Sequence, residues 1–505
     1  MDGARAVGQT AYGRLEAIFR RIALLGDARS LLHWDMAAMM PAGGAESRAE
    51  QLALLETLSH DMLVAPELPD LLDRAGDEGL EPWEQANLRE MRRHWTHASA
   101  LPTDLVEAVA RAESACEMVW REARQKADFA MVRPLLGELL DRVRDKAQAT
   151  ADRLGLAPYD ALLDHYEPGG RAAEIDPLFA DLEAFLSDFI GRVLDRQRAH
   201  PAPLTPDGPF PAESQRAVGL EMMAALGFDF DHGRLDTSHH PFCGGTHDDV
   251  RLTTRYDEAD FAKALMGVLH ETGHALYDLG LPGGRWRGQP VADARGMVIH
   301  ESQSLLIEMQ VCRSRDFIAW AAPRLAKAFG GAGPAWAADN LYRLGIRVRP
   351  GFIRIDADEV TYPAHVIIRA RLERALIAGD MKLDDLPAAW NESYGRLLGI
   401  TPPDDGVGCL QDIHWYCGAW GYFPTYTLGA MSAAQLFDAA RRSDPAIAKG
   451  VADGDFRPLL AWLRRHVHGR GSFLSTRALM TEATGRPLDP AVFKAHLQAR
   501  YLDGA

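Results

Sequence analysis

The chain has 505 residues, of which 47% are hydrophobic and 25% are charged, and its net charge is −16, from 55 Lys and Arg against 71 Asp and Glu. This balance is typical of a globular protein large enough to bury an enclosed cavity, and the excess of negative charge argues against a nucleic-acid or anionic-membrane partner. We see no run of about eighteen apolar residues and no secretion signal, so we expect no membrane span and a cytoplasmic location.

The cysteines are too few and too scattered for a disulfide framework. They are odd in number and none forms a CxxC pair: Cys116, Cys243, Cys312, Cys409 and Cys417. We therefore expect reduced thiols, and a metal would have to be held by histidine and carboxylate.

The first part of the chain has the periodicity of helices. From about residue 11 to about residue 199, apolar residues recur every three or four positions, as in AEQLALLETLSHDML. The stretch HPAPLTPDGPFP (200–211) contains five prolines and a glycine, so it cannot continue a helix. We find no internal repeat, and after this break we expect one more helix.

A short β-region follows that helix. The segments GRLDTSHHPF (233–242) and DDVRLTTRYD (248–257) have a period of two and many β-branched residues, and CGGTH (243–247) between them has the composition of a turn. The sequence therefore predicts a small antiparallel hairpin directly before the next helix. Helices dominate from there to the end, so the predicted fold is mainly α with a minor sheet.

That next helix carries the strongest motif. In DEADFAKALMGVLHETGHALYDLG (257–280), an acidic first turn favours the helix start, and Gly280 followed by Pro282 favours its end. His270 and His274 lie one turn apart on one face, and Glu271 projects roughly 100° away. Such a pair binds zinc, and the glutamate can deprotonate a zinc-bound water. Two histidines at this spacing can also be exposed or hydrogen-bonded in a core.

A catalytic zinc needs a third protein ligand. Glu301 is the best candidate because it opens a second helix, in GMVIHESQSLLIEMQVCRS, beyond a Gly- and Pro-rich loop. The neighbouring His300 competes for this role. Glu308 shares a helical face with Glu301 and could support it from behind, although both glutamates could also be solvated charges.

An arginine inside an apolar run points to a particular substrate group. Arg354 lies in FIRIDADEVTY, and a buried guanidinium is well suited to hold the α-carboxylate at the end of a peptide. Arg347 and Arg349 are nearby alternatives. The other interpretation is a structural ion pair of Arg354 with Asp356 or Asp358.

Several uncommon motifs in one order make the chain resemble the M32 metallocarboxypeptidases, the carboxypeptidase Taq family. They are LLHWDMAAMMPAGGAESRAEQLALL, DTSHHPF, DDVRLTTRY, HETGHALY, IHESQS, FIRIDADEVTY and WGYFPTYTLG, and together they extend over nearly the whole chain. HALYDLG, HESQSLLIEM and TYPAH differ in detail from the family's usual patterns, without removing a proposed ligand.

The resemblance implies a helical zincin-type fold with a deep central groove and a small sheet beside the HExxH helix. It implies one peptidase domain over 1–505, in which about 1–200 roofs the groove and about 212–505 carries the zinc site. The implied protein is a homodimer that removes C-terminal residues from peptides with broad preference.

The resemblance also implies residue roles. Zinc, for which Co²⁺ could substitute, is held by His270, His274 and Glu301, and Glu271 acts as general base and acid. Arg354 binds the substrate carboxylate. Tyr426, which with Tyr422 flanks a proline turn, hydrogen-bonds the tetrahedral intermediate or that carboxylate.

Four further residues are candidates for supporting roles near the site. By resemblance, His365 contributes at the oxyanion or behind the metal. His239, His240 and Arg251 either line the groove, where a strand edge could pair with a peptide, or brace the hairpin.

Two other functions remain open from the sequence. A related zinc oligopeptidase would cut internal bonds and would not need a free C-terminus. A silent peptide-binding protein of the same fold would keep the site without turnover, although the presence of Glu271 argues against it.

Overall fold

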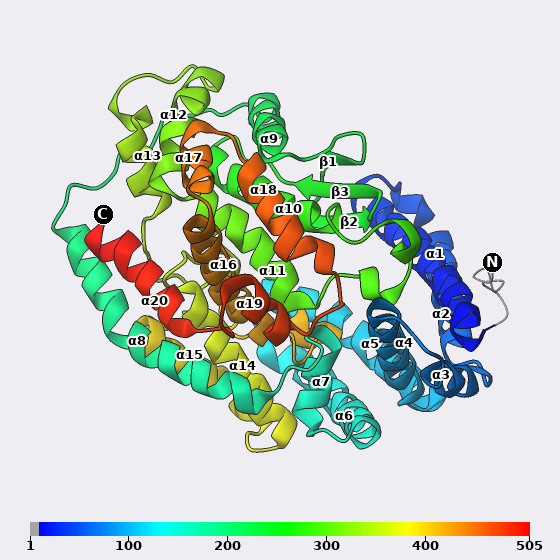
Figure 1. Cartoon of the computed structure of the whole chain (residues 1–505). Coiled ribbons are helices and arrows are strands. Elements are labelled where there is room, and N and C mark those ends of the chain that lie inside the picture. Colours follow the sequence, from blue (N-terminus) through cyan, green and yellow to red (C-terminus); the bar gives the residue numbers. More distant parts are fainter. Residues whose placement is uncertain (1–9, 505) are drawn as a thin grey trace, which may run out of the picture. The chain divides into compact units, whose positions relative to one another are not determined.

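The computed structural model describes residues 10–504, and it is mainly helical with one small sheet (Figure 1). This confirms the predicted fold class. Within this range, none of the helices combines the length and the apolar composition that crossing a membrane requires.

The described chain forms two compact units, each assembled from separate segments. The first unit takes the segment that ends at Ser99, together with Pro203–Leu344 and Ser432–Leu488. The second takes Ala100–Ala202, Gly345–Met431 and the segment that starts at Asp489.

The first unit contains the sheet. Its helices are α1 (Ala11–Ala38), α2 (Ala45–Leu63), α3 (Leu68–Gly76), α4 (Pro82–Ser99), α9 (Ala212–Leu226), α10 (Phe261–Asp278), α11 (Met297–Leu305), α12 (Arg315–Ala328), α13 (Ala338–Gly345), α17 (Pro445–Asp453), α18 (Arg457–His466) and α19 (Thr476–Thr484). Helix α16 (Pro424–Ser443) begins in the second unit and continues into the first.

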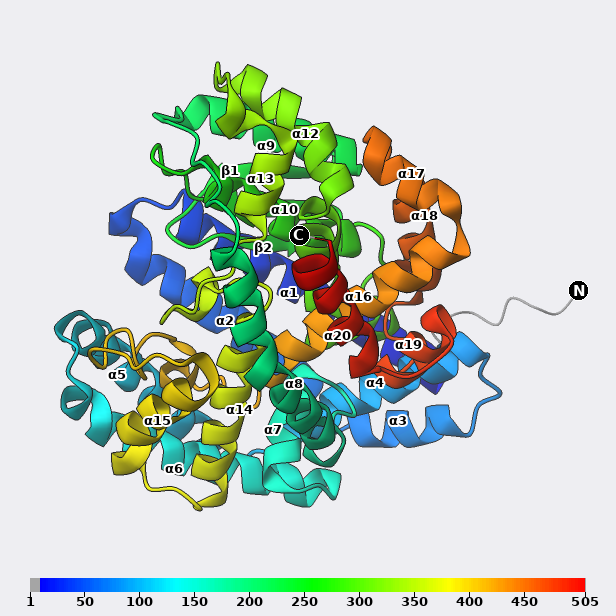
Figure 2. The ribbon, with the colours of Figure 1, turned by 90° about the vertical axis from the view of Figure 1, so that its left-hand side faces the viewer.

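The second unit is built from long helices. They are α5 (Thr103–Lys126), α6 (Phe129–Leu154), α7 (Pro158–Tyr166), α8 (Ala172–Arg198), α14 (Tyr362–Ala378), α15 (Leu386–Leu398) and α20 (Pro490–Gln498). Helix α20 packs on α8, although nearly 300 residues separate them in sequence (Figures 1 and 2).

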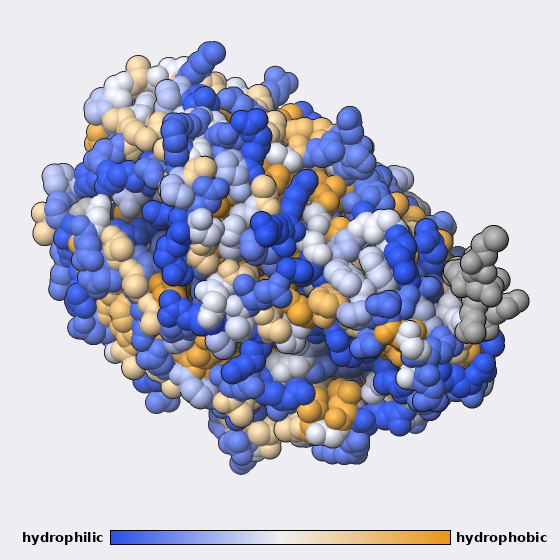
Figure 3. Space-filling view, viewed as in Figure 1, coloured by the Kyte–Doolittle hydropathy of each residue, from blue (hydrophilic) through white to orange (hydrophobic). Residues whose placement is uncertain are grey.

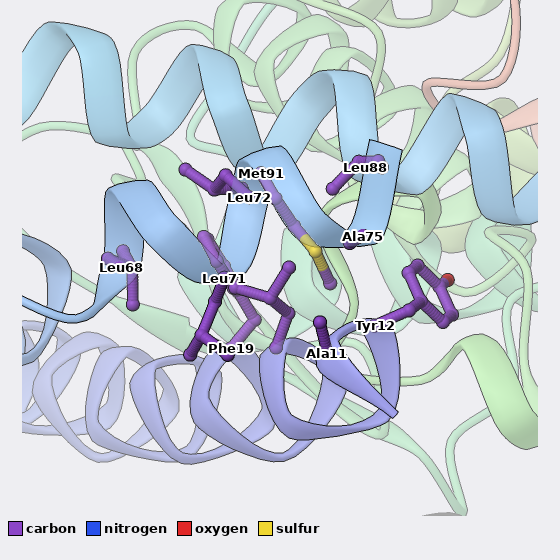
Figure 4. Packing of buried hydrophobic residues seen from close by; sticks show 10 residues of the cluster. Ala11, Tyr12, Phe19, Leu68, Leu71, Leu72, Ala75, Leu88 and Met91 are labelled. Carbon is purple, nitrogen blue, oxygen red and sulfur yellow. The ribbon is translucent and has the colours of Figure 1, made fainter. Parts of the chain in front are cut away.

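The helices predicted for 11–199 and the break at 200–211 are confirmed. The start of α1 packs on α3 and α4 through a cluster of buried side chains that includes Tyr12, Phe19, Leu71 and Met91 (Figure 4). These residues recur at helical spacing, so each helix buries one apolar stripe. On the face shown in Figure 3, hydrophilic residues predominate and hydrophobic ones are scattered in small groups, as expected for a strongly charged chain.

The sheet differs from the predicted hairpin. Its strands are β1 (Gly233–Thr237), β2 (Phe242–Thr246) and β3 (Asp249–Thr254), in the order β1-β3-β2. The stretch taken for a turn is largely β2, and the hairpin turns at residues 247–248. Strand β1 pairs with the other edge of β3 in parallel, so the sheet is mixed and not purely antiparallel.

The glycines in β2 explain why the sequence predicts a turn where the structure has a strand. Gly245 has a φ of 94°, and a Cβ atom there would lie 2.1 Å from the backbone oxygen of Asp249. The glycine is therefore required by a close approach of two paired strands, and not by a reversal of the chain.

Candidate metal centre and carboxylate site

Helix α10 presents the two histidines of the HExxH motif. The helix begins where Asp260 accepts hydrogen bonds from the backbone N–H groups of Ala262 and Lys263. The rings of His270 and His274 are 5.0 Å apart between centroids. Both face one side of the helix, as their spacing predicts.

Helix α11 supplies the third group because it packs very closely on α10 (Figure 1). A Cβ atom on Gly273 would lie 2.4 Å from the backbone oxygen of Gln303, so only glycine allows this approach. As a result, Oε2 of Glu301 lies 3.5 Å from Nε2 of His274 and 3.9 Å from Nε2 of His270. One ligand atom from each of the three residues lies within 4.8 Å of the others.

Glu308 supports His270 and not Glu301. After α11 the chain continues as a π-helical stretch over Leu306–Cys312, which rotates Glu308 away from the position that an α-helix would give it. Its Oε2 lies 3.0 Å from Nδ1 of His270, and its Oε1 accepts a hydrogen bond of 2.8 Å from Arg313. Nε2 of His270 is therefore left to face Glu301.

The charges around this group favour a cation. Burial lowers the pKa of His270, but Glu308, Glu301 and Glu271 outweigh it and raise that pKa to about 10. Burial raises the pKa of Glu301, but the neighbouring histidines outweigh it and lower that pKa to about 2. Carboxylates thus hold a positive charge here, and two imidazole nitrogens with one carboxylate oxygen form a donor set that suits zinc.

His300 lies beside the group but is directed elsewhere. Its ring is 4.5 Å from that of His274, and its Nε2 is 3.3 Å from Oδ1 of Asp278. Glu271 is buried, with 8% of its surface exposed, on the same helix as the two histidines. The geometry therefore favours Glu301 over His300 as the third ligand.

Arg354 lies in the second unit, inside a buried ion cluster. Its Nε and Nη2 donate to Oδ1 of Asp412 at 3.1 and 2.9 Å, and Nε of Arg369 donates to Oδ2 of the same carboxylate at 2.6 Å. Only 6% of Arg354 is exposed. Two guanidinium groups thus share one carboxylate, which leaves an excess of positive charge in a buried place.

The predicted alternatives around Arg354 take other positions. The carboxylate of Asp358 accepts backbone N–H groups, among them that of Arg349. Asp356 is exposed, as are the side chains of Arg347 and Arg349. The structural partner of Arg354 is therefore Asp412, and not the two aspartates nearer in sequence.

Tyr426 lies next to Arg354. Its ring centroid is 4.6 Å from Cζ of Arg354, and its hydroxyl is 3.0 Å from Nε2 of His414. His365 is fully buried, with Nδ1 2.9 Å from the hydroxyl of Tyr394 and no hydrogen-bond partner for Nε2 within residues 10–504. Burial holds the pKa of His365 well below its usual value, so this ring is neutral.

The hairpin residues separate into two groups. His239 and His240 are exposed in the bend after β1. Arg251 forms two hydrogen bonds with Asp249, of 2.9 and 2.6 Å, and its guanidinium carbon lies 4.6 Å from the ring centroid of Trp34. These contacts tie β3 to α1.

The sequence did not single out Asp412, His414 or Arg369. The first two follow each other closely in QDIHW (411–415), and Arg369 interrupts the apolar run HVIIRARL (365–372). Charged residues inside apolar or aromatic segments were the available signal, because a buried charge needs a partner.

Comparison with known proteins identifies the family of this chain. The family model described as "Carboxypeptidase Taq (M32) metallopeptidase" matches residues 14–501. The chain belongs to the M32 family.

The similarity extends over whole chains. "Thermostable carboxypeptidase 1" of Thermus thermophilus is 39% identical over 505 residues, which is 98% of both chains. "Carboxypeptidase 1" of Bacillus subtilis is 34% identical and covers 96% of both. The structure of "Trypanosoma Cruzi Metallocarboxypeptidase 1" has a TM-score of 0.95 and 40% identity, and covers 98% of this chain and 99% of that one. This M32 chain is accordingly a peptide hydrolase of the carboxypeptidase type, and its family implies a metal cofactor.

Proposed function

We propose that this protein is a zinc-dependent metallocarboxypeptidase that removes the C-terminal residue from peptides with a broad preference. The observation that carries this proposal is the convergence of His270, His274 and Glu301 in a group with a local excess of carboxylates. These three residues would hold the ion, and Co²⁺ could replace zinc because it accepts the same ligand types. The ion would polarise the scissile carbonyl and make a bound water more acidic.

Glu271 would be the general base and then the general acid. Its position beside His270 on α10 keeps it out of the ligand set. The carboxylate takes a proton from the attacking water and returns it to the leaving amine nitrogen. Burial of Glu271 keeps bulk water from competing for that proton.

Arg354 would bind the α-carboxylate of the substrate. The cluster of Arg354, Arg369 and Asp412 has two positive charges and one negative charge. Among residues 10–504, Arg354 hydrogen-bonds through its backbone N, Nε and Nη2, which leaves Nη1 for another acceptor. A substrate carboxylate would balance the charge and accept that hydrogen bond.

The remaining residues would have supporting roles. Tyr426 would hydrogen-bond the tetrahedral intermediate or the substrate carboxylate. His365 would support the oxyanion or the metal indirectly, and His239 and Arg251 would line the peptide path. We further propose a homodimer, which the family resemblance supports, and a cytoplasmic location in which the protein acts on free peptides.

A time course on one peptide tests the proposal. The purified protein is stripped of metal, restored with Zn²⁺ and incubated with a free-acid peptide and its C-terminal amide, and the products are measured by mass. We expect a ladder shortened from the free C-terminus, only with metal, and no cleavage of the amide. Internal fragments would indicate an oligopeptidase, and binding without products would indicate a silent peptide-binding protein.

The variant Glu271→Gln tests the proposed role of Glu271 as the general base. We expect it to retain Zn²⁺ and lose turnover, because the amide cannot accept the proton of the attacking water. Glu213→Gln, at an exposed position of α9, is the control and is expected to keep full activity. Substantial activity in Glu271→Gln would disprove the assigned role.

A further inference from the structure

His414 contacts Tyr426, the tyrosine proposed above to bind the substrate. His414 lies in the short helical turn His414–Cys417, and Tyr426 lies in the first turn of α16. Nε2 of the imidazole is 3.0 Å from the phenol oxygen. The ring of Phe423, 4.6 Å away between centroids, packs against the imidazole.

The other nitrogen of His414 faces a carboxylate. Nδ1 lies 4.0 Å from Oδ1 of Asp412, is buried, and has no hydrogen-bond partner within residues 10–504. Asp412 is held in place from two sides, because Arg354 and Arg369 bind its two oxygens. The imidazole therefore lies in the fixed field of this ion cluster.

The imidazole is neutral at ordinary pH. Burial and the guanidinium groups of Arg354 and Arg369 outweigh Asp412 and lower the pKa of His414 to about 4. A neutral imidazole has one N–H, and the other nitrogen can only accept. The position of that single proton decides which partner of the pair donates.

Asp412 is the carboxylate that faces Nδ1, at 4.0 Å, and it favours one of the two tautomers. With the proton on Nδ1, a positive N–H dipole points toward the carboxylate, whereas with the proton on Nε2 a lone pair would face it. The carboxylate favours the first arrangement, and in doing so it has to outweigh the two guanidinium groups that bind it. Nε2 is then an acceptor, and the hydroxyl of Tyr426 is the donor.

We propose that His414 is a positioning residue for Tyr426: Asp412 keeps the proton of His414 on Nδ1, and Nε2 accepts the Tyr426 hydroxyl hydrogen until a substrate anion takes over that bond. This inference rests on the proposed carboxypeptidase function, in which Tyr426 contacts the substrate. No covalent step is involved, and the proton stays on the phenol throughout. Arg354 and Tyr426 would thus present their donors to the same bound peptide.

The first test measures the tautomer without any activity. The protein is labelled with ¹⁵N-histidine, and the signals of His414 are assigned by their loss in His414→Gln. We expect an unprotonated Nε2 and a protonated Nδ1. A protonated Nε2 would overturn the proposal. His200→Gln, at an exposed histidine of the same unit, should remove only its own signals.

The second test is a double-mutant cycle on a free-acid peptide with His414→Phe, Tyr426→Phe and both together. We expect each single change to lower kcat/KM about tenfold, and the double change to do little more, because both remove one hydrogen bond. His414→Gln, which retains an acceptor, should recover part of the loss, and His200→Gln should have no effect. If the losses in kcat/KM of the two single variants multiplied in the double variant, His414 and Tyr426 would act independently, and the proposal would be contradicted.

A failure of the proposed carboxypeptidase function can be distinguished from a failure of the inference about His414. If no free-acid peptide is cleaved by the wild-type protein, the proposed function is wrong, and the tautomer measurement still decides the inference. If His414→Phe does not fold, the kinetics of His414→Gln and the spectrum of the wild-type protein are sufficient to test the role of His414. Zinc content and Tm are measured for every variant, because a purely structural role would lower Tm without coupling to Tyr426.

Discussion

Oε2 of Glu308 lies 3.0 Å from Nδ1 of His270, while Arg313 binds the other carboxylate oxygen at 2.8 Å. This contact keeps a proton on Nδ1 and turns Nε2 toward Glu301. The π-helical stretch Leu306–Cys312 brings Glu308 to this place. A backbone irregularity thus supports the first ligand of the proposed metal centre.

We predict that Glu308→Gln lowers the affinity for Zn²⁺ by roughly tenfold to a hundredfold, because a carboxylate orients the histidine and makes it more basic. Competition with a chromogenic chelator measures the affinity directly. Glu213→Gln, on the exposed side of α9, serves as the control. An unchanged affinity in Glu308→Gln would show that the contact does not support the metal.

The close packing of α10 and α11 depends on Gly273. A Cβ atom there would meet the backbone of Gln303 at 2.4 Å, so Gly273→Ala must push the helices apart. We expect a loss of about 1–3 kcal/mol in the free energy of unfolding, together with weaker Zn²⁺ binding. Gly267→Ala on the same helix is the matched control, because its Cβ would meet nothing within 4 Å, and it should stabilise the helix by up to about 1 kcal/mol. Denaturant titration of both variants measures the difference.

Local patterns predicted the parts of the site that depend on one helix. The i,i+4 spacing of His270 and His274 predicts their common face. The acidic residues of 257–260 were expected in the first turn of the helix, whereas α10 begins after them, at Phe261, with Asp260 as its capping residue. Glu301 was chosen because a loop lets its helix fold back, and the structure brings it to both histidines.

Contacts between distant segments could not be predicted. Asp412 is the partner of Arg354 although 58 residues separate them, and the sequence offered two nearer aspartates. The glycines of β2 look like a turn, since the composition does not show that another strand lies against them. Pairing and register are decided by tertiary contacts and not by local preference.

Arg354→Ala tests the carboxylate site. We predict that it lowers kcat/KM on a free-acid dipeptide by about tenfold to a hundredfold, mainly through KM, because a charge-assisted hydrogen bond contributes about 1.5–3 kcal/mol. Arg349→Ala, at an exposed arginine five residues earlier, should have no effect. Steady-state kinetics with both variants measures the change, and an unaltered KM in Arg354→Ala would rule out this role.

Glu373 is a buried acid that titrates near neutral pH. Its carboxyl lies 2.6 Å from the hydroxyl of Tyr159 and 3.0 Å from Nε1 of Trp415, and it is fully buried. Burial outweighs these hydrogen bonds and raises its pKa from 4.5 to about 7. The folded protein therefore holds this proton more tightly than the unfolded chain.

The sign of the pH effect follows from that difference. The stabilisation is fully present below pH 4.5, and it is lost as pH rises from 4.5 through about 7. Across this window the free energy of unfolding should fall by about 3 kcal/mol on account of Glu373. Glu373→Gln should remove this slope, whereas Glu392→Gln, at an exposed position of α15, should keep it. Urea denaturation at pH 5, 6, 7 and 8 measures the slopes, and parallel curves for wild type and Glu373→Gln would contradict the assignment.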